Sequence, residues 1–205
     1  MGGAVRISRS QRIQSWRQLS LWPHQIKALT VIERYIRARP ARAALIRMPT
    51  GTGKSGVIAV AAKSLKEAPS VLVVTPWLHL REQITIDIDY RFWQTIGIAS
   101  DQWSKEVKEI VPGSIRTFAL AGKTPRVLVC TIQTLQTIHR TDPKAYARLR
   151  EEVSLVLVDE GHREPAPEWA QAVRELKKPT VLLTATPYRN DYRIFDVDPS
   201  VSSQE

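Results

Sequence analysis

A glycine-rich turn that ends in a lysine and a serine is the segment of this sequence best suited to chemistry. The residues Gly-Thr-Gly-Lys-Ser occupy positions 51–55, between a short apolar run at 43–47 and a stretch with helical spacing of apolar residues. Glycines let backbone N–H groups point at a phosphate, and the positive end of a following helix favours an anion there. Lys54 can reach the β- and γ-phosphates of a nucleotide, and the Ser55 hydroxyl can ligate Mg²⁺. Glycine is usual where this sequence has Met48, but the strand–helix context disfavours the alternative of a chance turn.

Two adjacent carboxylates form a second candidate for catalysis. Asp159 and Glu160 follow an apolar run at 155–158 and precede Gly161 and His162. A carboxylate at a strand end beside a phosphate-binding loop can hold Mg²⁺, usually through water, and the next one can act as general base on the attacking water. Two acids after a strand also occur in solvated turns, so the catalytic assignment depends on the glycine-rich turn upstream.

Short apolar runs must position both candidates, and they alternate with segments of helical periodicity. The predicted strands cover 43–47, 71–75, 127–131, 155–158 and 181–184. This alternation indicates an α/β fold with a mainly parallel central sheet, in which ligands bind outside the carboxyl ends of the strands. A polar cluster follows each predicted strand directly, so we expect five clusters along one edge of the sheet.

Helices are predicted between these strands. The spacing of apolar residues predicts helices from Pro23 to before Pro40, from Ser55 to near Pro69, and over 132–139, 143–151 and 167–176. Residues 78–92 fit both a strand and a helix, and we favour a helix because parallel strands require a crossover between them. The segment 93–124 has no clear pattern and is expected to hold an insertion.

The charge of the chain bears on its partners. The 205 residues carry a net charge of +10, from 30 Lys plus Arg and 20 Asp plus Glu. This charge favours an anionic partner such as nucleic acid, while a merely soluble basic surface is the alternative. Residues 1–20 are expected to form a flexible basic lead-in rather than a dedicated DNA arm, 21–190 the folded domain, and 191–205 a tail or linker.

Cysteine content and hydropathy exclude several classes of protein. Cys130 is the single cysteine, so an intrachain disulfide and a Cys/His metal cluster are excluded, and we expect it to be a small buried hydrophobe. No apolar run approaches the roughly 18 residues of a membrane span, and the N-terminus lacks an apolar secretory segment, so we expect no membrane partner and a cytoplasmic location. Trp77, Trp93, Trp103 and Trp169 are expected in the core or at partner contacts rather than as base-stacking platforms.

Taken in order along the chain, these motifs resemble those of superfamily-two helicases and translocases of the DEAD/DEAH type. They look most like the branch shared with the helicase subunits of type I and type III restriction enzymes. The matching segments are 21–25 (Leu-Trp-Pro-His-Gln), 49–55, 75–83, 130–135, 159–162 (Asp-Glu-Gly-His) and 183–189. The resemblance covers about residues 20–195. It implies a three-layer P-loop NTPase (RecA-like) domain, the first of two motor lobes.

The resemblance also implies a role for each matched residue toward ATP, Mg²⁺ and nucleic acid. The implied nucleotide-binding residues are Gln25, which would read adenine, and Pro49, Thr50, Gly51, Thr52, Gly53, Lys54 and Ser55. The implied catalytic residues are Lys54, Asp159 and Glu160, and Ser55 and Asp159 would hold the metal. The implied nucleic-acid-facing or coupling residues are Thr75, Pro76, Thr131, His162, Thr184 and Thr186. Three alternatives stay open: Gln25 as a surface helix residue, Thr131 as a helix cap, and His162 as an ordinary exposed histidine.

Members of this family bind ATP between two lobes, and the second lobe supplies an arginine finger. Only residues 188–205 remain after the last motif, so we expect the second lobe to come from a longer protein or a partner chain. ATP hydrolysis by this chain alone is then expected to be weak or absent, and DNA is favoured over RNA as the nucleic acid. The alternatives are a non-catalytic ATP-binding or interaction module and a small-molecule kinase. The intact Lys54, Asp159 and Glu160 argue against the first, and the motifs after residue 75 argue against the second.

Overall fold

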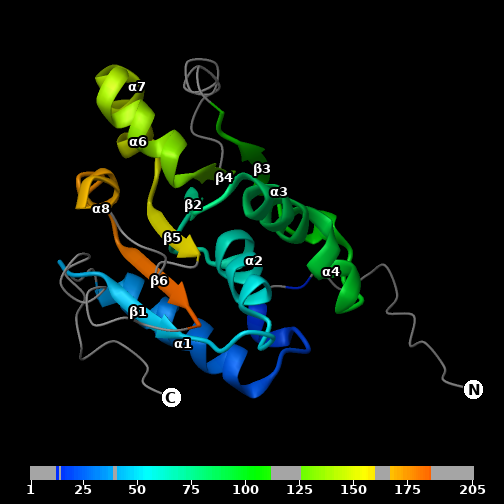
Figure 1. The fold of residues 1–205 in the computed structure, drawn as a ribbon. Coiled ribbons are helices and arrows are strands. Elements are labelled where there is room, and N and C mark those ends of the chain that lie inside the picture. The colour runs from blue at the N-terminus through cyan, green and yellow to red at the C-terminus, as the bar shows by residue number, and fades with distance from the viewer. Residues whose placement is uncertain (1–12, 14, 39–40, 112–125, 160–166, 186–205) are drawn as a thin grey trace, which may run out of the picture.

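Six parallel strands form one sheet at the centre of the structure (Figure 1). The computed structural model describes residues 13, 15–38, 41–111, 126–159 and 167–185. Within them the strand order is β1-β6-β5-β2-β4-β3, and every neighbouring pair runs parallel. The predicted α/β fold with a mainly parallel sheet is confirmed.

The elements follow one another as strand and helix in alternation. The strands are β1 (Ala44–Arg47), β2 (Val71–Thr75), β3 (Glu106–Glu109), β4 (Arg126–Thr131), β5 (Leu155–Asp159) and β6 (Thr180–Thr184). The α-helices are α1 (Pro23–Ala38), α2 (Lys54–Ser64), α3 (Leu78–Ile86), α4 (Phe92–Thr95), α6 (Ile132–Thr141), α7 (Pro143–Glu152) and α8 (Pro167–Arg174). Single turns are η1 (Trp16–Gln18), the π-helical η2 (Asp87–Arg91) and η3 (Ser100–Gln102). None of the helices in the described part of the chain has the length and apolar character needed to cross a bilayer.

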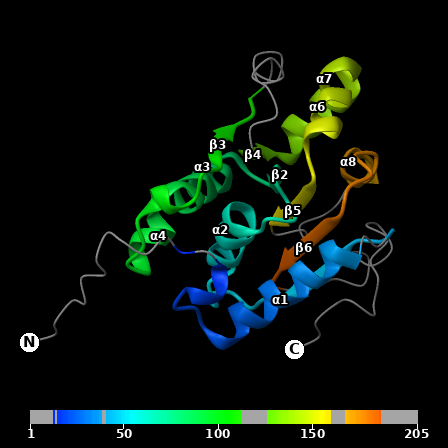
Figure 2. The ribbon, with the colours of Figure 1, turned by 180° about the vertical axis from the view of Figure 1, so that it is seen from behind.

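Helices cover both faces of the sheet, because successive side chains of a strand point to opposite sides. Val71 and Val73 of β2 pack on the face that α1, α2, α3 and α4 cover. Leu72 and Val74 of the same strand pack on the face of α6, α7 and α8. Figure 2 shows these three layers from behind. Strands buried on both faces are typical of parallel sheets, which explains why they appear in the sequence as continuous apolar runs.

Residues 78–92, whose sequence fits both a strand and a helix, are helical in the structure. α3, η2 and α4 continue into one another, with helical backbone angles at both junctions. The predicted helix is therefore confirmed, although its middle turn is π-helical. The indole N–H of the buried Trp93 donates to the Ile88 carbonyl oxygen at 2.7 Å, across that turn. A spacing of four between Ile84 and Ile88 fits α- and π-geometry alike, so the sequence could not distinguish them.

The strand β3 lies inside the segment for which the sequence showed no pattern. Its residues are Glu-Val-Lys-Glu, and among the described strands it pairs with β4 alone, with Val107 opposite Val127. Charged residues on an edge strand hinder pairing with another chain. They also remove the apolar signal by which the other five strands were predicted.

The last residues of the predicted flexible lead-in are packed against the domain. Trp16 and Leu19 are buried in the core, and Arg17 forms an ion pair with Glu33 of α1. The arginines of this segment led to the prediction that it is flexible. Burial of the Trp16 indole ring favours a packed conformation for its last residues. Residues 1–12 and 14 lie outside the described part of the chain.

Cys130 lies in the middle layer, fully buried on β4, as expected of a small hydrophobe. Burial raises the pKa of its thiol to about 12, and the positive charge of Arg81 opposes this change. The thiol therefore stays protonated and poorly nucleophilic at neutral pH.

Lys105 ties the carboxyl end of α2 to the segment that leads into β3. Its buried ammonium donates to the carbonyl oxygens of Ala62, Leu65 and Ala68 at 2.8, 3.0 and 2.5 Å. The last carbonyls of a helix have no donor within the helix, and a cation at that end also complements the helix dipole. Lys105 thus caps α2 from a distant part of the sequence.

The titration of Lys105 makes a testable contribution to stability. Burial lowers the pKa of its ammonium to about 8, while the charge of Glu67 acts in the opposite direction. An unfolded lysine titrates near pH 10.4, roughly, so the unfolded chain binds this proton more tightly than the folded chain. The Lys105 contribution to the free energy of unfolding should therefore increase as the pH rises from about 8 to about 10.

We expect Lys105→Met to lose this increase, as measured by urea unfolding at several pH values between neutral and about 10. The exposed Lys66, close to the end of α2, offers a control, because Lys66→Met should follow the wild-type pH profile. A difference between wild type and Lys105→Met that is the same at every pH would contradict the lowered pKa.

Candidate functional site

The glycine-rich turn connects the end of β1 to the start of α2. The Met48 N–H donates to the Thr184 carbonyl oxygen of β6 at 2.8 Å, which fixes where the turn leaves the sheet. Gly51 and Gly53 have φ of +81° and +74°, in the left-handed region that glycine adopts without strain. The N–H and the hydroxyl of Thr52 both donate to the Pro49 carbonyl oxygen. α2 then begins at Lys54, so the first N–H groups of that helix, which lack partners within it, lie at the turn.

Two side chains from the start of α1 brace this turn. The Gln25 amide donates to the Gly53 carbonyl oxygen at 3.1 Å and accepts from the Trp22 N–H at 3.0 Å. A nitrogen of the His24 ring lies 2.8 Å from the Thr52 carbonyl oxygen. A Cβ on Gly53 would lie 2.4 Å from the Gln25 amide nitrogen, so the Gln25 side chain would have to move away from the turn.

The burial of Gln25 settles one alternative left open by the sequence. The residue is 6% exposed, so it is not a surface helix residue. Its side-chain amide is hydrogen-bonded to the glycine-rich turn. The role of Gln25 toward adenine stays a prediction. His24 was not predicted as a site residue. The signal for it was its place beside Gln25 in the segment that resembles the family.

Trp22 is the second residue near the turn that the sequence did not single out. Its side chain is 55% exposed, although its ring lies close to Gly53 and packs against His24 with ring centroids 5.4 Å apart. An indole ring that is held on one side and open on the other can stack on a flat ligand group. This places a stacking surface beside the glycine-rich turn.

Lys54 and Asp159 bring the two predicted catalytic segments together. The Lys54 ammonium lies 3.3 Å from an Asp159 carboxylate oxygen at the end of β5, and both side chains are largely buried. Burial lowers the pKa of Lys54, and the neighbouring negative charge of Asp159 opposes that change. Since 105 residues separate the two in sequence, their contact is the strongest geometric agreement with the predicted site.

The donor set at this position suits a nucleotide with its metal. Ser55, in the first turn of α2, offers a hydroxyl, and Asp159 offers a carboxylate, both of them oxygen ligands that Mg²⁺ accepts. Lys54 and the N–H groups of α2 offer positive charge to phosphate oxygens.

Three predicted residues, Glu160, His162 and Thr186, lie outside the described part of the chain.

The predicted nucleic-acid-facing residues lie at the same edge of the sheet but are mostly buried. Thr75 and Thr131 are opposite one another at the ends of β2 and β4, and each is at most 6% exposed. The Thr131 hydroxyl accepts from the Thr134 N–H at 3.1 Å, so it caps α6, which was the alternative left open. Thr184 is fully buried below the glycine-rich turn, and Pro76 is half-buried. Contact between these residues and nucleic acid stays a prediction.

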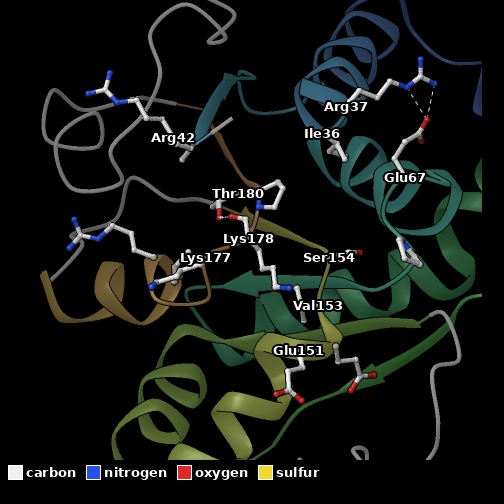
Figure 3. A pocket seen from close by; sticks show the side chains of 17 residues that line it. Ile36, Arg37, Arg42, Glu67, Glu151, Val153, Ser154, Lys177, Lys178 and Thr180 are labelled. Carbon is white, nitrogen blue, oxygen red and sulfur yellow. Dashed lines mark hydrogen bonds and ion pairs between the residues drawn. The ribbon is translucent and has the colours of Figure 1, made fainter. Parts of the chain in front are cut away.

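A hollow at the opposite, amino-terminal edge of the strands lies away from this site (Figure 3). Arg42, Lys178 and Glu151 line it, and Arg37 forms an ion pair across its rim with Glu67 at 2.7 Å. Charges of both signs thus surround it, and no sequence motif falls within it. We assign this hollow no part in nucleotide binding.

Comparison with known proteins gives one family and two solved structures. A model of the family described as "Type III restriction enzyme, res subunit" matches residues 18–189. A nuclease-deletion mutant of the type ISP restriction-modification enzyme LlaGI, in complex with a DNA substrate mimic, is 18% identical with a TM-score of 0.58, and the match covers 82% of this chain and 17% of that one. Dbp5 of S. cerevisiae, bound to RNA and ADP BeF3, is 17% identical with a TM-score of 0.55, with 94% of this chain and 52% of that one covered. No curated protein sequence matches the chain.

The chain therefore spans 17% and 52% of the lengths of these two proteins. The two structural matches agree with the three-layer parallel fold, and the family match covers the turn, the strand-end carboxylate and the segment before α1. The chain belongs to the type III restriction enzyme res subunit family, and its fold is that of the first RecA-like lobe of a superfamily-two helicase.

Proposed function

We propose that this chain is the ATP-binding lobe of a nucleic-acid-dependent ATPase, a helicase or DNA translocase. The observation that carries this proposal is the contact between Lys54 and Asp159 beside the glycine-rich turn. It joins a phosphate-binding cation to a metal-binding carboxylate at the carboxyl edge of a parallel sheet, where ligands bind in such folds. ATP with Mg²⁺ is the ligand that this pair of groups fits.

The proposed roles follow from where each side chain lies. Lys54 and the first N–H groups of α2 would bind the β- and γ-phosphates, and Ser55 and Asp159 would hold Mg²⁺. When bound, the metal neutralises negative charge on the phosphate oxygens. Glu160, the next residue after Asp159, would orient and deprotonate the attacking water. A phosphate near Lys54 competes with Asp159 for the ammonium, so nucleotide binding would loosen that ion pair.

The base of the nucleotide would lie toward α1. Gln25 keeps a second amide hydrogen and a second lone pair beyond its bonds to the turn, which suits one edge of adenine. Trp22 presents an exposed ring beside Gly53, on which a base could stack. Because Gln25 also holds the Gly53 carbonyl, it would link recognition of the base to the shape of the phosphate-binding turn.

The proposed motor also needs a second lobe. Hydrolysis in this family depends on a second lobe with its arginine finger, worth on the order of 10³–10⁵ in rate. We propose that this lobe comes from a longer polypeptide or a partner chain. The net charge of +10 and the nucleic acids bound to LlaGI and Dbp5 support a nucleic-acid substrate, and the restriction-enzyme family favours DNA.

A non-catalytic ATP-binding module from a truncated helicase is the second candidate. It would bind ATP through the same turn and would stay without turnover in the presence of any nucleic acid or second lobe. The carboxylate of Glu160 beside Asp159 argues against it, because binding of ATP with Mg²⁺ needs Lys54 and Asp159 but no general base.

Lys54→Ala tests the proposed phosphate site. We expect ATP affinity to fall by about 10- to 100-fold, the loss that corresponds to one charge-assisted hydrogen-bonding group. Titration with labelled ATP and Mg²⁺ measures it, and Lys66→Ala, an exposed lysine near the other end of the same helix, should bind as wild type. Unchanged affinity in Lys54→Ala would refute the site. Steady-state ATP hydrolysis in the presence of the second lobe, with single- and double-stranded DNA and RNA, then separates the motor from the non-catalytic module.

Gly53→Ala tests the brace between α1 and the turn. The substitution places a Cβ at a φ of +74° and against the Gln25 amide, whereas Gly97→Ala places one at a φ of +73° with nothing within 4 Å. Both variants should lower the free energy of unfolding by about 1–2 kcal/mol through the backbone conformation. Only Gly53→Ala should also weaken ATP binding, as measured by the same titration. Equal ATP affinity in both variants would show that ATP binding does not depend on the conformation of the turn at Gly53 or on its contact with Gln25.

A further inference from the structure

An exposed tryptophan and leucine stand at the carboxyl end of β2. Trp77 is 46% exposed and Leu78 is 56% exposed, whereas Trp16 and Trp93 are buried in the core. We call Trp77 and Leu78 the apolar step. The sequence placed Trp77 in the core or at a partner contact, and its exposure excludes the core.

The backbone of the apolar step is firmly held. The Trp77 carbonyl oxygen accepts from the Thr75 hydroxyl at 3.3 Å and from the Arg81 N–H at 3.0 Å. Arg81 is itself buried and forms an ion pair with Glu109 of β3 at 2.9 Å. The start of α3 is thereby anchored to the sheet on two sides. The indole ring is exposed on a rigid support, so little conformational entropy is lost when a ligand packs on it.

The apolar step also lies where the proposed nucleic-acid path would run. β2 and β4 end side by side, with Thr75 opposite Thr131, on the edge of the sheet that carries the glycine-rich turn. The hydroxyls of these two threonines are bound within the fold and hidden from solvent. A strand that crosses the end of β2 would therefore meet the rings and methyl groups of the step before it met either hydroxyl.

The size of the step identifies the kind of ligand that fits it. Polar side chains surround the two apolar residues on the first turns of α3, since His79, Glu82 and Gln83 are exposed. A stable protein interface buries about 800 Å² on each partner, far more than two side chains offer. A single nucleobase, by contrast, covers one aromatic ring, and the stacking is worth about 1–3 kcal/mol per base.

We infer that Trp77 is a base-stacking platform, with Leu78 packing beside it, and that this lobe therefore binds a strand whose bases are unpaired. A base inside a duplex already stacks on its neighbours and cannot also cover the indole ring. The inference rests on the proposed function, since it takes for granted that nucleic acid crosses this edge of the lobe. It adds the form of that nucleic acid: a single strand at the end of β2.

The test compares Trp77→Ala and Trp77→Phe with wild type and with Tyr90→Ala. Tyr90 is a matched control because it is an aromatic residue with similar exposure (43%) on η2, away from the strand ends. Fluorescence polarisation of labelled single-stranded and double-stranded oligonucleotides, of DNA and of RNA, gives each affinity at several salt concentrations. Circular dichroism checks that every variant is folded.

We expect Trp77→Ala to bind single strands about 5- to 150-fold more weakly than wild type, which is the loss of one stacked base. Trp77→Phe should recover most of that loss, and Tyr90→Ala should bind as wild type. The salt dependence of binding should be the same in Trp77→Ala and wild type, because no phosphate contact is removed. Duplex affinity should not change.

Two different failures can be told apart. If wild type binds nucleic acid with a clear salt dependence and Trp77→Ala binds single strands equally well, the stacking role is wrong and the proposed function stands. Equal losses on single strands and duplexes would also overturn the stacking role. If wild type binds no nucleic acid at any salt concentration, both the inference and the proposed function fail.

Discussion

The parallel pairing of the strands is the constraint on which the rest of this lobe depends. Because all six strands run the same way, every strand ends at the same edge, and whatever follows a strand is delivered to that edge. The glycine-rich turn after β1, the carboxylate after β5 and the segment after β2 become neighbours in this way. The ion pair between Lys54 and Asp159, two residues far apart in sequence, is the direct result.

Hydrogen bonds from other elements hold the glycine-rich turn in its conformation. His24 and Gln25 reach from the start of α1 to two successive carbonyl groups of the turn, and Met48 is fixed to β6. The glycine-rich turn is therefore held from two other elements, α1 and β6, rather than by its own glycines alone. A segment that precedes the loop by more than twenty residues thus helps to decide its shape.

Most of the fold could be predicted because the buried strands are apolar on both faces and the helices keep their period. Five of the six described strands and the helices between them were found in this way. β3 was missed because its charged residues leave no apolar run, and the π-helical turn because its spacing imitates an α-helix. The anchoring of Trp16 depends on the rest of the domain and leaves no local pattern.

The site was predicted less evenly. Lys54 and Asp159 could be paired because each carries a motif with its own chemistry. No sequence motif indicates whether a side chain at a strand end points outward or into the fold. Thr131 and Thr75 have residue types suited to phosphate contact, yet their hydroxyls are used inside the fold. Trp77, in the same 75–83 segment, is exposed, although it was expected in the core or at a partner contact. Sequence can name the strand end that meets a ligand, but packing decides which side chain there faces outward.

The helix α2 is held at both ends by side chains from other parts of the chain, Gln25 at its start and Lys105 at its finish. Every residue from Gly56 to Ser64 between them is buried. Such a helix cannot fray from either end, and water reaches its peptide groups only when the layers around it separate. The slow exchange of its amide hydrogens with solvent deuterium would therefore report the stability of the whole lobe, while the helices at the surface would exchange through local openings.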